Sequence, residues 1–481
     1  MYTWTLILTA LLMQTLSVPP RGSVTLSTSD ARLQETFDWA KRTALGYAHD
    51  GTDPVGYWYE AALPGREAFC MRDVSHQSIG GEILGLSRHN FNMMYKFAVN
   101  ISEAKDWCSY WEMNRYDKPA PVDYADDKDF WYTLTASPDV VQTCYRLYEW
   151  TGNKEYLTNP ALEDFYEKSL TVYLDRWKLN PDELMSRPRR THTENPPGAN
   201  ARFQQVRGIP SYVEAAGGFT CGVDLVSALY AGCKAYGEML SVRGQKEKAA
   251  QFLGKAQIYK TLIKEKWWNE RKGLFETFVM PGGEFRDNVQ AINGLTYVIW
   301  FRAASEPART KAVLDLLMKR PCNIENRSHY PYLLYRGHRP EDAYHVLLSL
   351  KDMKRSAYPE VSFGVMEGIV AGLMGVRPSA TRGVVQTLPQ LTPATEWAEV
   401  VAVPVLGTII GVRHEGTAKS MFINSGNSTV KWQASFYGDH RTIKVNNREM
   451  DAESATDGTG NRYAFVEVEV SPNKKVTAST P

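Results

Sequence analysis

The sequence predicts a large, mainly α-helical domain followed by a small all-β domain. From about residue 27 to residue 375, apolar residues recur at spacings of three and four, the period of an amphipathic helix. After Pro378 the chain changes to short β-branched and aromatic runs. A chain of 481 residues also exceeds what one ordinary core supports. We therefore expect a helical domain over residues 27–378 and a C-terminal β-sandwich over residues 385–476.

The helical part divides into a dozen predicted helices. Each is a stretch of apolar periodicity bounded by Gly, Pro or a polar cluster. The predicted helices cover residues 30–47, 75–86, 90–105, 139–151, 162–177, 222–240, 246–267, 289–304, 306–318, 329–335, 340–350 and 363–374.

Short and long connections alternate between these helices. The long ones cover residues 50–73, 106–138, 180–221, 269–288, 320–328 and 352–362. In an antiparallel helical array every second connection emerges on the same side, so the long loops would share one face. Six helical hairpins closed into a ring form an (α/α)6 toroid. Long loops without regular structure are usually functional, so we expect a pocket on this face.

The C-terminal part consists of short predicted strands. The runs are QTLPQL, VAVPVLGTIIGVRHE, AKSMFINSG, TVKWQASFYG, RTIKVNN and YAFVEVEVSP. They are partly alternating and are bounded by Gly, Asn and Pro, which is typical of a sandwich of antiparallel sheets.

The first 20 residues have the pattern of a signal peptide. Their apolar run, residues 4–12, is too short to span a bilayer and is followed by small residues near Ser17. No Lys or Arg precedes the run, so an apolar N-terminal strand is the alternative interpretation. We expect export, with a periplasmic or secreted location, and no later stretch is long enough for a membrane helix.

Composition excludes several classes of function. The 55 basic and 54 acidic residues leave a net charge of +1, whereas nucleic-acid binding normally needs a concentrated basic face. The six cysteines are scattered without a CxxC pair, so we expect buried thiols rather than zinc ligands or a disulfide framework. No GxSxG, GxxxxGK, HExxH or strand-linked GxGxxG motif is present. No metal or organic cofactor is expected, and the oligomeric state is left open.

The long loops combine carboxylates with Trp, Tyr and Arg. Carboxylates and Arg hydrogen-bond to hydroxyl groups, and aromatic rings stack on sugar faces, so this mixture favours a carbohydrate pocket for an oligosaccharide or polysaccharide. The candidate side chains are Tyr57, Trp58, Arg72, Asp73, His76, Trp111, Tyr212, Glu214, Glu325, His329, Tyr358 and Glu360.

Three segments resemble six-hairpin glycosidases. MRDVSHQSIGGEILGL (residues 71–86) resembles the Arg-Asp segment of glucoamylase-like members, which holds hydroxyls of the sugar being cleaved. RGIPSYVEAAGGFTCGVDL (207–225) resembles their third-loop segment, in which an aromatic precedes the glutamic acid that protonates the leaving group. Residues 358–391 are similar to the last barrel helix of α-L-rhamnosidase-like members, where a sixth-loop carboxylate is the general base. Glucoamylases have a second acidic residue where Ala215 stands, so substrate and family stay open.

The resemblance implies an inverting glycoside hydrolase, in which one carboxyl group protonates the leaving oxygen and another activates water. Glu214 is the expected acid, because partial burial against Tyr212 would keep it protonated. Glu360 is the expected base, and Asp73 is the reserve candidate for the acid. The expected substrate-binding residues are Arg72, His76, Tyr57, Trp58, Trp111, Tyr212, Glu325, His329 and Tyr358.

Several of these residues also have a structural interpretation. Asp73 is equally a helix cap beside its own Arg, Glu214 a solvated loop carboxylate, Glu360 an N-cap partner of the final helix and His329 a hydrogen-bonded core histidine. Two other functions also fit the composition. One is a polysaccharide lyase on a similar toroid, and the other is a glycan-binding protein without catalysis.

Overall fold

The computed structural model describes residues 20–188, 191, 198–214, 217–286, 292–304 and 306–481. The expected signal peptide therefore lies outside the described residues except for residue 20, and so does Ala215. Within the described part of the chain, no helix has the length and apolar character needed to cross a membrane.

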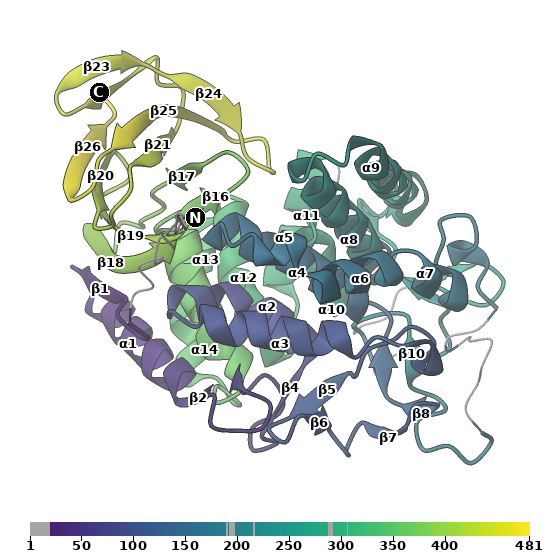
Figure 1. Cartoon of the computed structure of the whole chain (residues 1–481). Helices are drawn as coiled ribbons and strands as arrows, with labels where there is room; N and C mark the ends of the chain where they lie inside the picture. Colours follow the sequence, from purple (N-terminus) through teal and green to yellow (C-terminus); the bar gives the residue numbers. More distant parts are fainter. Residues whose placement is uncertain (1–19, 189–190, 192–197, 215–216, 287–291, 305) are drawn as a thin grey trace, which may run out of the picture.

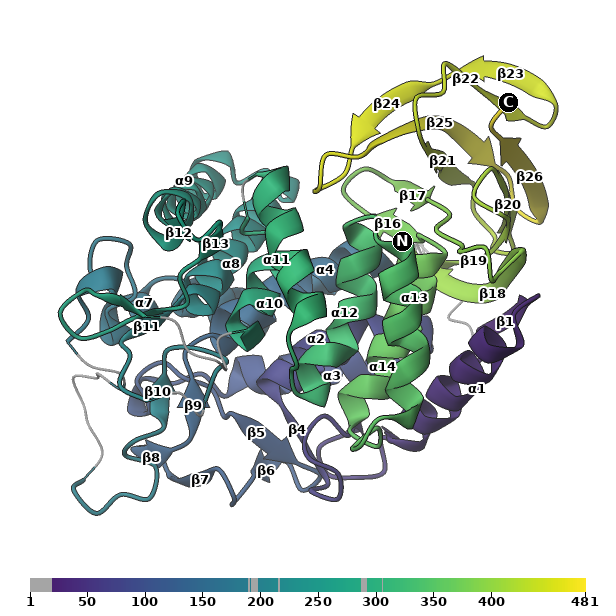
Figure 2. The ribbon, with the colours of Figure 1, turned by 180° about the vertical axis from the view of Figure 1, so that it is seen from behind.

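Six helices pack side by side into a closed inner ring (Figures 1 and 2). Around the ring they are α2 (Met71–Ile83), α4 (Ala136–Thr151), α8 (Val223–Val242), α10 (Ile292–Trp300), α12 (Ile324–Arg336) and α14 (Pro359–Glu367), which returns to α2. A π-helical stretch, Gly368–Leu373, continues α14.

An outer layer of helices covers this ring and alternates with it along the sequence. The outer helices are α1 (Ala31–Gly46), α3 (Ser87–Val99), α6 (Pro160–Ser169), α9 (Lys246–Leu262), α11 (Pro307–Lys319) and α13 (Pro340–Ser349). Shorter helical pieces are α5 (Glu155–Thr158), α7 (Val172–Trp177), Glu103–Lys105, Leu184–Ser186, Ile263–Trp267 and Leu350–Asp352. The pairing of inner with outer helices is the hairpin arrangement that the alternating loop lengths predicted.

Local sequence explains where these helices begin and how closely they pack. The side chain of Asp30 accepts hydrogen bonds from the first backbone N–H groups of α1, and that of Asn323 does the same for α12. At Gly80 of α2, a Cβ atom would lie 2.4 Å from a backbone oxygen of α14, and at Gly364 of α14 it would lie 2.6 Å from one of α12. Only glycine permits these close approaches between inner helices.

Short strands lie in the loops at the end of the ring where the inner helices begin. They are β2 (Ala48–Asp50), β3 (Tyr57–Tyr59), β4 (Ala68–Cys70), β5 (Glu112–Asn114), β6 (Lys118–Pro119), β7 (Tyr124–Asp126), β8 (Asp129–Phe130), β9 (Tyr132–Thr133), β10 (Arg207–Ile209), β11 (Cys221–Gly222), β12 (Trp268–Asn269), β13 (Leu274–Phe275), β14 (Phe278–Val279) and β15 (Phe285–Arg286). Arg207 and Asp106 form a fully buried ion pair that ties the second long loop to the third. These loops are therefore held in place by pairing and by charge.

Two antiparallel-rich sheets form the C-terminal part and cover the opposite end of the ring (Figure 1). The seven-stranded sheet contains, in order, β1 (Thr25–Thr28), β18 (Trp397–Val405), β19 (Thr408–Glu415), β20 (Lys419–Asn424), β26 (Lys474–Ser479), β22 (Thr442–Val445) and β23 (Arg448–Asp451). The five-stranded sheet contains β16 (Arg377–Ser379), β17 (Val384–Thr387), β21 (Val430–Tyr437), β25 (Arg462–Val470) and β24 (Glu453–Thr456).

Side chains of the two sheets meet, and the sheets also contact the ring. Phe422 of β20 stacks on Trp432 of β21 at 5.4 Å between ring centroids. The indole N–H of Trp150 in α4 donates to the carbonyl of Pro404, and the imidazole of His414 lies 2.9 Å from the carbonyl oxygen of Met374. The sheets extend beyond the predicted range of residues 385–476, because β16 begins at Arg377 and β26 ends at Ser479. They also include β1 from the start of the described chain, which pairs with β18.

Candidate active site

A cavity of about 480 Å³ opens at the end of the ring where the inner helices begin. Its lining comes from α2, from the segment before α8, from α10 and from the start of α12. The described lining residues are Arg72, Tyr212, Val213, Glu214, Ile292, Asn293, Tyr297, Pro321, Cys322, Asn323, Glu325 and Asn326. The unpaired N–H groups and positive dipole ends of the inner helices point toward this end, which favours carboxylates and ligand oxygens.

Arg72 joins two of the expected catalytic carboxyl groups. Its Nη1 donates to Oε1 of Glu214 at 2.5 Å, and its Nε donates to Oδ1 of Asp73 at 3.3 Å. The other oxygen of Asp73 accepts from the hydroxyl of Tyr358 at 2.9 Å. The guanidinium carbon lies 5.6 Å from the ring centroid of Trp111. The predicted grouping of these residues from four loops is thus present in the structure.

Asp73 is not the N-cap of its helix. Helix α2 begins at Met71 with Cys70 as N-cap, and no side chain makes the capping hydrogen bond. Asp73 lies in the first turn, buried, with both oxygens engaged by Arg72 and Tyr358. The structural interpretation of Asp73 as a cap is therefore wrong.

Glu214 faces the cavity with 37% of its side chain exposed. Partial burial raises its pKa, while Arg72 opposes this rise and the nearby carboxylates Asp73 and Glu325 add to it. The segment that carries Glu214 is held by Asp224 of α8, whose Oδ2 accepts from the hydroxyl of Ser211 at 2.8 Å and from the backbone N–H of Tyr212 at 2.6 Å. Glu214 is thus a held, partly buried carboxyl group.

Glu360 belongs to a buried chain of hydrogen-bonding groups. Its Oε1 lies 3.2 Å from Nδ1 of His76, and Nε2 of His76 lies 3.0 Å from Oδ2 of Asp139. The hydroxyl of Tyr212 donates to the same oxygen of Asp139 at 2.5 Å.

The pKa shifts in this chain favour protonated carboxyl groups and a neutral imidazole. Burial raises the pKa of Asp139 to about 7, burial and the nearby Asp73 raise that of Glu360 well above its usual value, and burial lowers that of His76. A neutral imidazole has one donor and one acceptor nitrogen, so it donates to one carboxylate and accepts from the other, protonated, carboxyl group. A neutral His76 can therefore pass a proton between Glu360 and Asp139.

His329 lies next to both His76 and Glu360. Its ring centroid lies 4.7 Å from that of His76, and its Nε2 lies 3.9 Å from Oε1 of Glu360. Ligand atoms of His76, His329 and Glu360 all lie within 4.8 Å of one another, and among the described residues this is the set that could hold a metal ion. Two imidazoles and a carboxylate are suitable ligands for zinc or iron.

Three other predicted residues do not line the cavity. Trp58 is fully buried, donates its indole N–H to Asp53 and stacks on His49, so its expected contact with substrate is wrong. Tyr57 packs beside Arg88 and is absent from the cavity lining. Trp111 is only 6% exposed and supports Arg72.

The remaining predicted residues, Tyr212 and Glu325, line the cavity. Tyr212 stacks on Tyr297 at 3.9 Å between centroids, and Glu325 accepts a hydrogen bond from Arg355 at 3.2 Å. Sequence reasoning missed Asp139 and Tyr297, which follow apolar periodicity within helices. The available signal was the acidic residue in SPDVV, which stands where an inner helix would otherwise be apolar.

Comparison with known proteins identifies the fold. No protein-family model and no curated protein matches the sequence. Among solved structures, the chain is similar to an α-L-rhamnosidase from Dictyoglumus thermophilum, with TM-score 0.60, 10% identity and coverage of 96% of this chain and 51% of that one. A family 78 rhamnosidase from Bacillus sp. GL1 gives TM-score 0.57 and 14% identity, covering 82% of this chain and 41% of that one.

An α-L-rhamnosidase from Aspergillus terreus gives TM-score 0.56 and 10% identity, with coverage of 94% and 50%. This chain thus spans about half the length of these neighbours. Together with the closed inner ring, the similarity shows that the chain has the six-hairpin fold found in α-L-rhamnosidases.

Proposed function

We propose that the protein is a glycoside hydrolase that cleaves its substrate with inversion. The observation that carries this proposal is the pair of carboxyl groups, Glu214 and Glu360, both of which interact electrostatically with Arg72 and Asp73. Inverting hydrolysis needs one protonated carboxyl group and one carboxylate around a single bond. A neutral-pH acid must hold its proton, and the raised pKa of Glu214 favours this role.

Glu360 must be ionised to activate water, and its neighbours offer a way to achieve this. Its proton can pass to Nδ1 of His76 while Nε2 of His76 gives its own proton to Asp139, whose pKa of about 7 suits it to hold that proton. The carboxylate left on Glu360 then accepts a proton from the attacking water. Asp73, Tyr358 and Arg72 would bind hydroxyl groups of the sugar at the point of cleavage.

The substrate we propose to test first is an α-L-rhamnoside, because three neighbours in fold are rhamnosidases. Other α-glycosides of plant or microbial glycans form the rest of the panel. With wild type, the expected result is release of a monosaccharide whose first-formed anomer, followed by proton NMR, is opposite to that of the substrate.

Variants test Glu214 as the acid, Glu360 as the base and Asp73 as the alternative acid. We expect Glu214→Gln and Glu360→Gln each to lose about 10²- to 10⁴-fold in kcat. Asp73→Asn tests whether Asp73 is the acid instead: an activated aryl glycoside, whose leaving group needs no protonation, should rescue the variant of the true acid. Glu469→Gln, an exposed carboxylate of β25, is the matched control and should retain full activity.

Other outcomes would point to the other functions. An absorbance rise from an unsaturated product would identify a lyase, and glycan binding without turnover across the panel would identify a binding protein. Full activity in both Glu variants would remove the proposed mechanism. We also propose that residues 1–20 direct export, which N-terminal sequencing of protein from a secreting host would test.

A further inference from the structure

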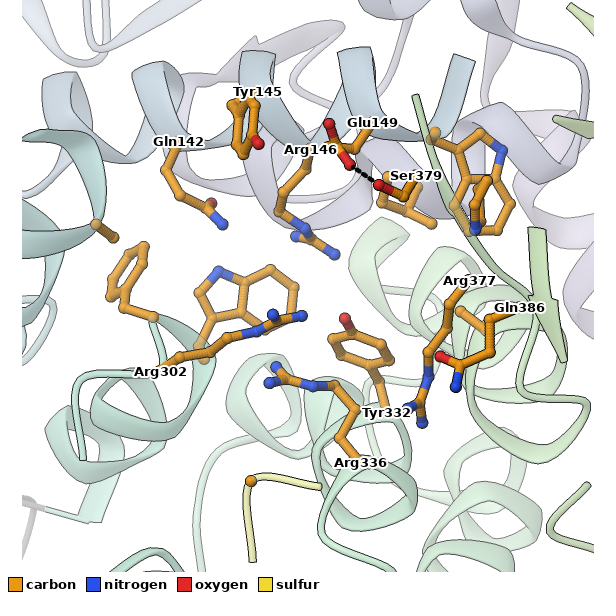
Figure 3. Close-up of a pocket in the computed structure, with 18 of the residues that line it drawn as sticks. Gln142, Tyr145, Arg146, Glu149, Arg302, Tyr332, Arg336, Arg377, Ser379 and Gln386 are labelled. Carbon is orange, nitrogen blue, oxygen red and sulfur yellow. Dashed lines mark hydrogen bonds between the residues drawn. The ribbon is translucent and has the colours of Figure 1, made fainter. Parts of the chain in front are cut away.

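A second cavity, of about 570 Å³, lies at the opposite end of the ring, where the inner helices end and the C-terminal sheets begin (Figure 3). Its walls come mainly from α4, α8, α10, α12 and α14 and from strands β16 and β17, with single residues from α2, β24 and β25. Six basic side chains line it against three acidic ones, Glu149, Glu367 and Asp457. The basic residues are Arg146, Lys234, Arg302, Arg336, Arg377 and Arg382. We call this space the arginine cavity.

Three of these six basic groups have no carboxylate partner in the described part of the chain. Of the other three, Lys234 pairs with Glu238 at 3.1 Å. Arg146 pairs with Glu367 at 2.5 Å, and Arg382 at the exposed rim pairs with Glu467 at 2.8 Å. Among the described residues, no carboxylate lies within 4.0 Å of a guanidinium nitrogen of Arg302, Arg336 or Arg377. Three guanidinium groups thus face one space without a carboxylate in ion-pair contact.

Buried donors in this cavity also lack acceptors. Nη1 of Arg146, Nε and Nη2 of Arg377 and Nε1 of Trp300 are all buried without a hydrogen-bond partner. An unpaired buried donor costs about 1–3 kcal/mol, more when it is charged. In Figure 3 the guanidinium groups of Arg146, Arg302 and Arg336 point toward one another. A ligand that supplies several oxygen acceptors would satisfy these groups together.

Mutual repulsion is visible in the pKa values of two groups. Burial together with Arg302, Arg377 and Arg146 lowers the pKa of Arg336 to about 9. Burial would raise the pKa of Tyr332, but Arg336, Arg146 and Arg302 lower it to about 8. The cavity therefore holds a positive potential that makes the Tyr332 hydroxyl more acidic than an ordinary phenol.

Aromatic rings fix the guanidinium groups in place. The guanidinium carbon of Arg146 lies 4.6 Å from the ring centroid of Trp300 and 5.7 Å from that of Tyr332, and that of Arg336 lies 5.4 Å from Tyr332. Such cation–π contacts orient the planar guanidinium groups, so little side-chain conformational entropy is lost when a ligand binds to them.

We propose that the arginine cavity binds a ligand bearing a phosphate or sulfate group. Guanidinium forks match the oxygens of such groups in bidentate geometry, and a dianion would offset the uncompensated charges. The volume suits a ligand larger than the oxyanion itself, within the range of about 300–1,000 Å³ usual for small-molecule sites. The ligand is therefore either an inorganic polyanion or a phosphate or sulfate ester whose body contacts the rings. This site is separate from the proposed catalytic cavity and does not depend on the proposed function.

Calorimetric titration of the full chain tests this proposal with pyrophosphate, glucose 6-phosphate, glucose 6-sulfate and neutral glucose. We expect one anion per chain and no binding of glucose at this site. Arg336→Gln and Arg377→Gln should each weaken the anion about tenfold or more. Arg413→Gln, an arginine of β19 outside the cavity, is the charge-matched control, and Arg72→Gln shows whether the anion instead enters the catalytic cavity. Tighter binding of the esters would identify a sugar ester, and tighter binding of pyrophosphate an inorganic ligand.

A measurement on wild type alone keeps the proposal testable if the variants fold poorly. Because Tyr332 has the lowered pKa, its phenolate absorbance should appear first in a pH titration, and Tyr332→Phe should remove that phase. A bound anion offsets the arginines and should move this phase to higher pH. The proposal is overturned if no anion binds, if the phase does not move with pyrophosphate, or if Arg336→Gln and Arg377→Gln bind as tightly as Arg413→Gln.

Discussion

The raised pKa of Asp139 leads to a prediction about stability that separates structure from catalysis. Burial raises the pKa of Asp139 from its ordinary 3.8 to about 7. Because the folded-state pKa exceeds the unfolded one, the stabilisation from the protonated form is full below pH 3.8 and is lost as the pH rises to about 7. At about 1.4 kcal/mol per pH unit, the loss over this window is about 4 kcal/mol.

Asp139→Asn removes this loss, because the amide is neutral and resembles the protonated acid. We expect the variant to match wild type near pH 4 and to exceed its free energy of unfolding by up to about 4 kcal/mol at pH 8. The same variant should lose activity, because the amide cannot take up a proton from His76. Asp182→Asn, an exposed aspartate, is the control and should change neither quantity.

Denaturant unfolding at a series of pH values measures the difference between Asp139→Asn and wild type. A difference that does not depend on pH would refute the placement of the proton. A variant that is less stable than wild type at pH 8 would do the same, since it would mean that the ionised carboxylate is favoured by its surroundings. Full activity of a stabilised variant would instead remove Asp139 from the mechanism.

Three further changes test other features. Gly364→Ala should destabilise the protein by about 1–3 kcal/mol, because its Cβ would meet a backbone oxygen of α12. Gly254→Ala in α9 has open space around it and should stabilise the protein slightly. Thermal unfolding measures both variants, and equal effects would contradict the close approach at Gly364. Trp58→Phe should reduce the unfolding free energy by about 1 kcal/mol through its lost hydrogen bond and leave the KM unchanged; a large rise in KM would return this residue to the substrate site. Excess zinc should inhibit turnover by binding to His76, His329 and Glu360, and His329→Gln should relieve that inhibition. Inhibition of equal strength in the variant would mean that zinc binds elsewhere.

The sequence predicts the ring well because its signal is local and repeated. Each hairpin contributes apolar periodicity and one long connection, so errors of a few residues leave the architecture intact. The helix starts are less well predicted. Helices α2, α12 and α14 begin at Met71, Ile324 and Pro359, four or five residues before the predicted positions 75, 329 and 363.

These early starts have one physical cause. Asp73, Glu325 and Glu360 are polar residues that pattern reasoning assigns to loops, but each lies in the first turn of its helix. Unpaired backbone N–H groups at a helix start accommodate such carboxylates even when they are buried. The face proposed to be catalytic is therefore built from helix ends more than from loops.

Long-range partners were beyond pattern reasoning. Strand β1 pairs with β18 across more than 350 residues, with Thr25 opposite Val401. The apolar surroundings of Asp139 hid it among core positions, and the aromatic cluster at Trp58 gave no sign that its ring would be enclosed. Such outcomes depend on which segments meet after folding, and a single sequence does not record that.

The indole of Trp300 lies between the histidines near the candidate active site and the arginine cavity. On one side its ring lies 5.1 Å from those of His76 and His329, and on the other it faces the guanidinium group of Arg146 at 4.6 Å. The charge of Arg146 acts past this ring, since it lowers the pKa of His76 on the other side. An anion bound in the arginine cavity would therefore change the pKa of His76 on the other side of the Trp300 ring, without a conformational change.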